Sequence, residues 1–348
     1  MIECIFTLDY EVYGNGQGSL RELVYEPARR LMGIFQRADA RLVVFVEAAE
    51  LEIIESNRTD IAIGLVKEQV WQFRREGFEI GLHLHPQWYN ARQESGTWVL
   101  DYSEYNLCML KRKRIEWMVH KGIEYLRGVL KEPGFTPFSF RAGNWLLQPS
   151  QNAAAVLAEQ GIRVDSSVFK GGLQRDRSLD YRPALKNGYY WRFQHDVNAK
   201  EPEGRLLEMP IYTRLVPFWR MLTPKRVALQ QKGNAPAHKT AQVSLRQRAS
   251  RACDLLRFRY PLKFDFCRMT LDELRASIDD AIRDDQKSPD SLKPLVAIGH
   301  TKDLDDFETV TRILSYLKDM GIKVSTFEEV YGRCQGVAVP QGIHAANQ

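Results

Sequence analysis

The chain has 348 residues, 44% of them hydrophobic, and a formal net charge of +5. This length allows a large buried core, and no uncharged apolar run reaches the roughly 18 residues of a membrane span. The five cysteines stand singly without a C-x-x-C spacing, which argues against a disulfide framework and a zinc ribbon. Since no secretion signal precedes the first strand-like segment, we expect a soluble, cytoplasmic protein.

Apolar runs rich in Val, Ile and Phe alternate with segments of helical periodicity along the whole chain. Strands are predicted over residues 2–8, 41–46, 78–84, 136–141, 162–165, 206–212 and 294–299. Helices are predicted over residues 21–38, 65–76, 104–130, 150–160, 270–286 and 305–320. This alternation is typical of a parallel α/β sheet or barrel, and we expect a single domain over 1–332 with a C-terminal tail, 333–348.

Two connections are unusually long, 166–205 and 213–262. The second is basic: between Arg214 and Lys263 the net charge is +11, which leaves −6 for the rest of the chain. Apolar residues recur there with helical spacing among arginines, so peripheral contact of 243–262 with an anionic membrane, grip on a phosphate, and a plain solvated helix all stay open. Nucleic acid is not expected as a partner, because no recognised module accompanies the charge.

Four of the predicted strands end in charged or metal-capable side chains. These are Asp9 and Glu11, His83 and His85, Arg141, and His300. In barrels and open parallel sheets the carboxyl ends of the strands carry the active site, because the loops leave the strands there. The pattern therefore predicts one shared site at this edge.

The spacing within the first two pairs adds a second constraint. Side chains at i and i+2 of a strand share a face, with Cα atoms about 6.6 Å apart, so both imidazoles of His83 and His85 can reach one ion. Asp9 and Glu11 have the same parity. A catalytic zinc commonly takes two histidines and one carboxylate and keeps a position open for water, so we predict a divalent metal ion, Zn²⁺, at this site.

Five blocks, "TLDYE", "EIGLHLHP", "FRAGNW", "LLEMPIY" and "LVAIGHT", resemble the polysaccharide deacetylases, the metal-dependent carbohydrate esterases of the NodB-homology type. The resemblance is strongest to the WbmS-like and WalW-like groups of bacterial surface-polysaccharide loci. It covers nearly the whole chain apart from the basic insertion and the tail. It implies a distorted (β/α) barrel of about seven strands, with 213–262 as an insertion.

The resemblance also implies roles for the residues of the first two blocks. Asp9 matches the family's general base, Glu11 a metal-binding carboxylate, and His83 the first metal histidine. The common second metal histidine is replaced by Gln87 in this sequence, so His85 would serve instead. Whether Asp9 or Glu11 binds the metal stays open.

The later blocks match the rest of the family's catalytic residues. Arg141 matches the arginine that orients the base and lowers its pKa, and Asn144 falls where a backbone N–H holds the developing oxyanion. His300 matches the general acid. For the carboxylate that tunes His300, Glu208 and Asp265 are both available.

Aromatic residues near these blocks are candidates for carbohydrate contacts. Trp88 and Trp145 would bind substrate by stacking on sugar rings, with core packing as the equal alternative for each.

The combined pattern predicts hydrolytic deacylation, N-deacetylation above all, of an amino sugar in O-antigen or capsule biosynthesis. The substrate would be a carbohydrate, including a nucleotide-linked or lipid-linked one. Two alternatives stay open: a glycosidase that uses Asp9 and Glu11 as acid and base, and a non-catalytic carbohydrate-binding protein on a deacetylase scaffold.

Overall fold

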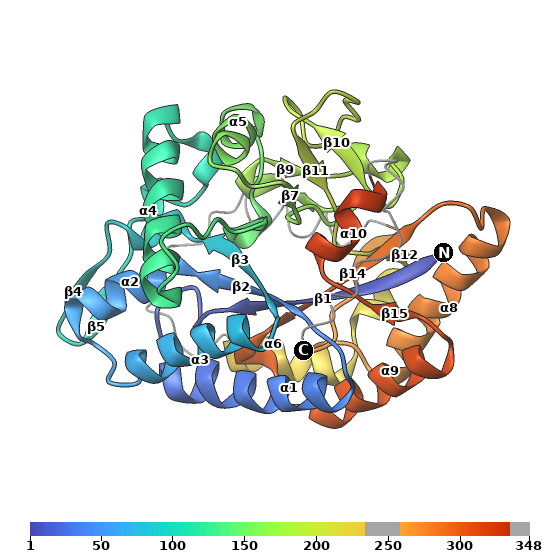
Figure 1. Ribbon diagram of the computed structural model, residues 1–348, viewed down its shortest axis with the longest axis horizontal. Helices are drawn as coiled ribbons and strands as arrows, with labels where there is room; N and C mark the ends of the chain where they lie inside the picture. The colour runs from blue at the N-terminus through green and yellow to red at the C-terminus, as the bar shows by residue number, and fades with distance from the viewer. Residues whose placement is uncertain (234–257, 335–348) are drawn as a thin grey trace, which may run out of the picture.

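The structure is a computed structural model, and it describes residues 1–233 and 258–334. A curled sheet forms its centre, with the strand order β10-β11-β7-β6-β3-β2-β1-β14 and a short β15 that pairs with β1 (Figure 1). The bounds are Ile2–Tyr10 for β1, Val43–Glu47 for β2, Glu79–Leu84 for β3, Ser139–Ala142 for β6, Val164–Asp165 for β7, Trp191–Phe193 for β10, Leu206–Glu208 for β11, Lys293–His300 for β14 and Lys323–Val324 for β15. Neighbouring strands are parallel except for β10, which pairs antiparallel with β11. All seven predicted strands are present.

The sheet closes into a barrel through single bridges rather than a long strand. Ile211, just after β11, bridges both Phe169 and Val296. The backbone N–H of Ile211 donates to Val168 O at 2.8 Å, and the N–H of Tyr212 donates to Val296 O on β14 at 2.9 Å. These bonds join the segment after β11 to β14 at the other end of the sheet, so the predicted distorted (β/α) barrel is confirmed.

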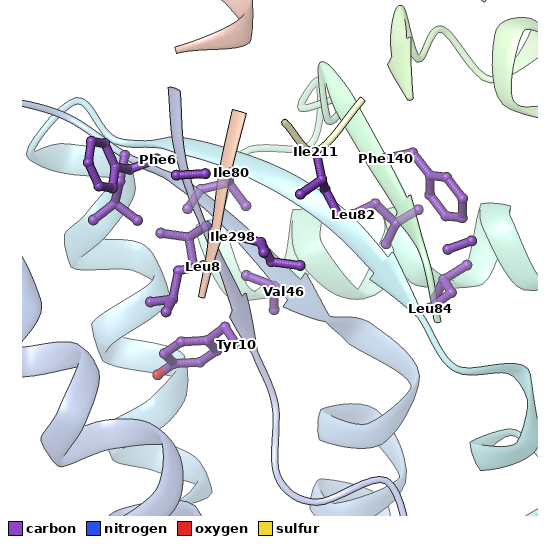
Figure 2. Packing of buried hydrophobic residues seen from close by; sticks show 14 of the residues in the cluster. Phe6, Leu8, Tyr10, Val46, Ile80, Leu82, Leu84, Phe140, Ile211 and Ile298 are labelled. Carbon is purple, nitrogen blue, oxygen red and sulfur yellow. The ribbon is translucent and has the colours of Figure 1, made fainter. Parts of the chain in front are cut away.

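Helices surround the barrel on its outside. Their bounds are Glu26–Arg37 for α1, Ile63–Arg75 for α3, Arg112–Leu130 for α4, Gln151–Glu159 for α5, Leu271–Lys287 for α8 and Phe307–Asp319 for α9. Phe6, Leu8 and Tyr10 alternate along β1 and point into the apolar layer between sheet and helices (Figure 2). Because strand side chains alternate between faces, Asp9 must point into the barrel.

The interior of the barrel has an apolar floor. Ile5, Phe45 and Val296 pack there with Phe327 and Val330 of α10 (Phe327–Cys334). The floor fills the end where the parallel strands begin. The predicted polar side chains lie at the other end of the interior, where the parallel strands end.

Two predicted helices differ in detail from those observed, and the structure also has helices that were not predicted. The helix expected over 104–130 begins at Arg112, after 3-10 turns at Tyr102–Glu104 and Leu107–Met109, since the side chain of Asn106 accepts from the N–H of Cys108. The helix expected over 21–38 opens as a π-helix, Arg21–Tyr25, before the proline in the first turn of α1. A further helix, α2 (Ala48–Asn57), follows β2 directly.

The basic connection begins and ends in a two-stranded hairpin. β12 (Thr213–Val216) pairs antiparallel with β13 (Tyr260–Lys263), and α6 (Pro224–Gly233) follows β12. Residues 234–257 lie outside the described residues, as does the tail from 335. They include most of the segment 243–262, for which membrane contact, phosphate binding and a plain solvated helix all stay open. In the described ranges, none of the helices is long and apolar enough to cross a bilayer.

The other loops carry small hairpins. β4 (Arg92–Glu94) pairs with β5 (Thr97–Val99), and β8 (Leu173–Gln174) pairs with β9 (Leu179–Asp180). The long connection 166–205 therefore contains its own local structure.

Candidate active site

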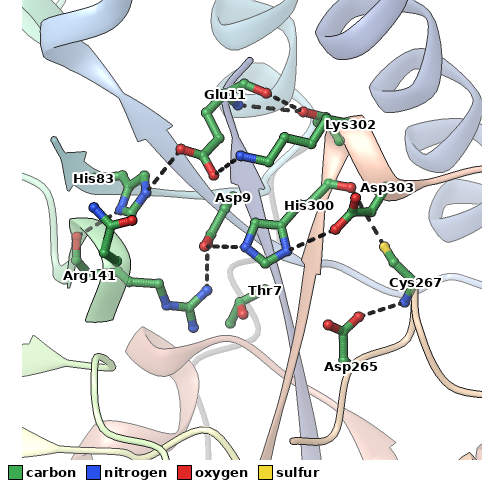
Figure 3. A network of polar contacts seen from close by, with 12 residues as sticks. Thr7, Asp9, Glu11, His83, Arg141, Asp265, Cys267, His300, Lys302 and Asp303 are labelled. Atoms are coloured by element: carbon green, nitrogen blue, oxygen red, sulfur yellow. Dashed lines mark hydrogen bonds and ion pairs between the residues drawn. The ribbon is translucent and has the colours of Figure 1, made fainter. Parts of the chain in front are cut away.

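Strand register brings the predicted polar residues into one layer. Asp9 of β1 lies opposite His300 of β14, and His83 of β3 lies opposite Arg141 of β6. Figure 3 shows Asp9 between Arg141 and His300, with His83 directed toward Glu11. The structure thus gathers the ends of four strands at one point, as the sequence predicts.

Asp9 is held by two basic groups. Arg141 Nη1 lies 2.5 Å from Asp9 Oδ1, and His300 Nε2 lies 3.4 Å from Oδ2. Burial opposes ionisation of Asp9, but Arg141, followed by His83 and His300, holds the pKa of this carboxyl below its usual value. Asp9 is therefore an anion that can accept a proton at the atom facing the site.

Arg141 is itself fixed by its surroundings. Its Nε donates to Ser166 O at 2.9 Å, and Nη2 donates to the Ser166 hydroxyl at 3.2 Å. The guanidinium lies 4.3 Å above the ring centroid of Phe45, and the side chain is fully buried. This rigid setting leaves the Asp9 carboxylate one orientation.

Glu11 faces both histidines of the H-x-H pair. Its Oε2 lies 3.5 Å from His83 Nε2 and 3.0 Å from His85 Nε2, while Oε1 accepts from Lys302 Nζ at 2.7 Å. Burial raises the pKa of Glu11, but Lys302 and His85 outweigh it and bring this pKa well below the usual range. Lys302, which the sequence analysis did not single out, therefore leaves one carboxylate oxygen directed at the imidazoles.

The tautomer of His83 is set by a backbone carbonyl. Nδ1 lies 2.8 Å from Arg141 O, which can only accept, so Nδ1 carries the proton and Nε2 presents a lone pair. Both His83 Nε2 and Glu11 Oε2 are buried without a hydrogen-bond partner. Two acceptors that face each other in a buried site require a cation or a proton between them. The donor set therefore fits a divalent metal ion.

A proton can take the same position. Burial disfavours the charged imidazole, yet Glu11 and Asp9 outweigh this effect and raise the pKa of His83. Proton and metal ion therefore compete for one lone pair.

His85 is oriented by three neighbours. Its backbone N–H donates to Glu47 Oε1 at 2.6 Å, and Nδ1 lies 3.2 Å from the side-chain amides of both Gln87 and Asn144. The amide nitrogens of Gln87 and Asn144 face Nδ1. The oxygen of buried Gln87 has no hydrogen-bond partner, and turning this amide would let that oxygen accept the Nδ1 proton and leave Nε2 of His85 free for a metal ion. Gln87 and Asn144 thus position the imidazole of His85.

Two groups of three residues in the described parts of the chain could hold a metal ion. One is Glu11, His83 and His85; the other is Asp9, Glu11 and His300, and within each group the ligand atoms lie within 4.8 Å of one another. Glu11 belongs to both groups. Since Glu11 Oε2 lies within 3.5 Å of Nε2 of both His83 and His85, we take Glu11 as the carboxylate ligand.

The acid beside His300 is one that the sequence analysis missed. Asp303 Oδ2 lies 3.9 Å from His300 Nδ1 and is held by Arg268 at 2.6 Å. The sequence spacing His-x-x-Asp, which spans the turn Thr301–Asp303, could have indicated that Asp303 lies beside His300.

The structure places Glu208 and Asp265 with other partners. Glu208 accepts from the N–H of Val168 at 3.1 Å, and burial with the neighbouring Asp165 raises its pKa well above the usual value. Asp265 accepts from the N–H groups of Cys267 and Arg268, both at 3.0 Å. The predicted link from either acid to His300 is replaced by Asp303.

The turn after β6 approaches the metal candidates closely. Asn144 and Trp145 both have left-handed backbones, with φ of 55° and 61°. A Cβ on Gly143 would lie 2.6 Å from Leu84 O and 2.8 Å from His85 Cγ, so only glycine fits. Strain of this kind concentrates at functional sites.

The two predicted sugar-stacking residues are placed differently. Trp145 is partly buried, and its ring packs edge to face with His300, with centroids 6.1 Å apart. Trp88 is fully buried and packs against Trp98 of the β4–β5 hairpin, with centroids 5.2 Å apart. The prediction that Trp88 stacks on a sugar is therefore wrong, because its ring belongs to the core.

Neither a family model nor a curated protein matches this chain. Among solved structures, a putative polysaccharide deacetylase from Mycobacterium smegmatis matches with a TM-score of 0.53 and 14% identity, over 100% of this chain and 95% of the other. The Puue allantoinase matches with a TM-score of 0.52 and 12% identity, over 97% and 92%. A probable polysaccharide deacetylase from Pseudomonas aeruginosa PAO1 gives 0.51 and 13%, over 95% and 91%. The chain thus has the fold of these hydrolases.

Proposed function

We propose that the protein is a metal-dependent hydrolase that removes an acyl group, the N-acetyl group above all, from an amino sugar. The observation that carries this proposal is the pair of facing, unpartnered acceptors, His83 Nε2 and Glu11 Oε2, beside the Asp9–Arg141 ion pair. Glu11, His83 and His85 would hold the ion, which we take to be Zn²⁺. Bound there, a divalent ion supplies polarisation of the acyl carbonyl and a more acidic water.

Side chains and one backbone N–H of the protein would carry out the proton transfers and stabilise the oxyanion. Asp9, kept ionised by Arg141, accepts the proton of the attacking water. His300 donates a proton to the leaving nitrogen, and Asp303 stabilises the charged form of its imidazole. The N–H of Asn144 would donate to the oxyanion, in the turn that also touches His85.

The substrate class follows from the sequence blocks and the neighbours. Two of the similar structures are described as polysaccharide deacetylases. The resemblance to proteins of surface-polysaccharide loci favours O-antigen or capsule biosynthesis, with a nucleotide-linked or lipid-linked amino sugar in the cytoplasm as substrate.

The electrostatics of the site disfavour a glycosidase. Such an enzyme needs one protonated carboxyl as general acid, with a raised pKa. Asp9 and Glu11 both have pKa values below their usual range, so both are anions at neutral pH. A glycosidase mechanism would also leave His83 and His85 without a role.

The test is acetate release from N-acetylated sugars by zinc-loaded protein. We expect chelation and His83→Ala to abolish release, while Asp9→Asn lowers it by about 10²- to 10⁴-fold but retains zinc. His120→Ala, at an exposed position on α4, is the matched control. Release that persists after chelation and in His83→Ala would overturn the proposal, and bound zinc without turnover on any sugar would favour a non-catalytic binding protein.

A further inference from the structure

Among the residues that the structure describes, the cations around the site are paired with acids, with one exception. Arg141 pairs with Asp9, Lys302 with Glu11, and Arg268 with Asp303. Lys263, the last residue of β13, makes its contacts with aromatic rings instead. Within the described residues no hydrogen-bond acceptor or acid lies in bonding distance of its ammonium.

Lys263 reaches the site over an aromatic platform. Its Nζ lies 3.1 Å from the ring centroid of Trp145 and 5.0 Å from that of Phe169. The ring of Trp145 also packs against Phe169, with centroids 5.6 Å apart, and against His300, with centroids 6.1 Å apart. The ammonium of Lys263 is therefore no farther from the centroid of the His300 ring than the 3.1 Å and 6.1 Å distances added together. Since the ammonium covers one face of Trp145, that face is closed to a stacking sugar.

The backbone around Lys263 is tied to the strand that carries His300. Lys263 pairs with Thr213 across the β12–β13 hairpin, and the next residue, Phe264, donates to Tyr212 O at 2.8 Å. Asp265 bridges Ile298 of β14. The lysine and His300 are thus carried by one hydrogen-bonded unit, which gives the ammonium a defined place relative to the reaction.

Burial of the Lys263 ammonium at this position costs free energy. Desolvation lowers the pKa of Lys263 to about 7, although the neighbouring Asp265 opposes the shift. The cation-π contact with Trp145 offsets only part of this cost. An anionic group on a ligand would form an ion pair with Lys263, as the acids of the chain do with the other cations around the site.

We propose that Lys263 forms a subsite for an anionic group on the sugar substrate, a ring carboxylate or a phosphate, beside the acyl group that is removed. This inference rests on the proposed function and names the substrate class more narrowly. The net charge of +11 between Arg214 and Lys263 has the sign that attracts such a substrate.

The test compares sugars that differ by one charged group. The substrates are N-acetylglucosamine, N-acetylglucosaminuronic acid with a carboxylate at C6, and N-acetylglucosamine 1-phosphate; the variants are Lys263→Met, Lys263→Arg and, as control, Lys113→Met at an exposed position of α4. We expect Lys263→Met to lower kcat/KM for one acidic sugar about tenfold more than for the neutral sugar, through KM. Lys263→Arg should retain the preference and Lys113→Met should not alter it. Which acidic sugar responds identifies carboxylate or phosphate as the source of the charge.

Two outcomes overturn the inference. One is an equal loss on all three sugars, which would mean that Lys263 acts on the reaction rather than on an anion. The other is no change on any of them. If wild-type protein deacetylates none of the sugars, the proposed function fails, and calorimetric binding of the two acidic sugars still decides this inference. Tighter binding to wild type than to Lys263→Met supports the subsite, and equal binding overturns it.

Discussion

His83 Nε2 and Glu11 Oε2 lie 3.5 Å apart in a buried site, and neither atom has a hydrogen-bond partner. We predict that Glu11→Gln binds zinc at least tenfold more weakly than wild type, because an amide oxygen lacks the charge that the ion requires. Zinc per chain by elemental analysis and the dissociation constant by chelator competition measure this. His195→Ala, an exposed site paired with Glu201, should bind zinc as wild type does. Equal zinc affinity in Glu11→Gln and wild type would show that the ion, if bound, lies elsewhere.

Acid should release the metal ion through the same contact. Glu11 and Asp9 raise the pKa of His83, so protonation of Nε2 begins at a higher pH than for a free histidine and competes with the metal ion. Zinc affinity is then highest above the raised pKa and falls as the pH decreases through it. Chelator competition between about pH 8 and about pH 5 measures the slope. A dissociation constant independent of pH over this range would contradict the proposed ligand.

Asp303 gives His300 a measurable pH signature. Burial lowers the pKa of His300, and both Asp9 and Asp303 counteract that effect. Asp303→Asn should lower the pKa of His300 further, so the imidazole that we propose as general acid loses its proton at lower pH. We expect the basic limb of the pH–rate profile to move to lower pH, with a loss of about 10- to 100-fold in kcat at neutral pH. Asp290→Asn, an exposed site, is the control, and an unmoved basic limb would remove Asp303 from the mechanism.

Gly143 tests how tightly the turn after β6 positions His85. Gly143→Ala places a methyl group 2.6 Å from Leu84 O and 2.8 Å from His85 Cγ, so the imidazole must shift. We expect zinc affinity and deacetylation each to fall about tenfold or more. Gly128→Ala on α4 meets nothing within 4 Å and should keep both properties, with a gain of about 0.5–1 kcal/mol in stability. If Gly143→Ala retains full zinc affinity, the close approach does not position the ligand.

The site could be anticipated from sequence because its main residues obey two simple rules. Asp9 and Arg141 sit at the carboxyl ends of buried strands, and alternation along β1 and β3 puts Asp9, Glu11 and His83 inside the barrel. Neither rule depends on knowing which strands are neighbours. The alternation of side chains along a strand and the position of active sites at the carboxyl ends of parallel strands are together enough to predict the cluster.

The residues that sequence reasoning missed depend on turns and on packing between distant segments. Lys302 and Asp303 reach the site only because the 3-10 turn after β14 folds back over β1. Trp88 is buried because the β4–β5 hairpin carries Trp98 onto it, a contact no local pattern predicts. Lys263 arrives by a strand pairing across the basic connection, between residues about fifty positions apart.

The opposite end of the barrel contains a buried acid with consequences for stability. Glu79, at the start of β3, accepts from the Ser139 hydroxyl at 2.7 Å and from the N–H of Glu328 at 2.9 Å. Burial raises its pKa from 4.5 to about 7. The folded protein therefore holds Glu79 protonated over a range in which the unfolded chain ionises it, and this group's contribution to stability is full below about pH 4.5 and is lost as the pH rises through about 7.

Glu79→Gln should remove this pH dependence, because glutamine never ionises. Its oxygen can accept from the N–H of Glu328, and its amide N–H can donate to the Ser139 hydroxyl oxygen. At about pH 8 the wild type should have lost roughly 3 kcal/mol of the free energy of unfolding that Glu79 contributes at low pH. Between about pH 4.5 and about pH 8, the free energy of unfolding of Glu79→Gln should therefore rise by that amount relative to that of the wild type. Urea denaturation across this range measures it, with the exposed Glu76→Gln as control. Parallel curves for Glu79→Gln and wild type would mean that Glu79 is ionised in the folded protein, with water or a basic group reaching the base of β3.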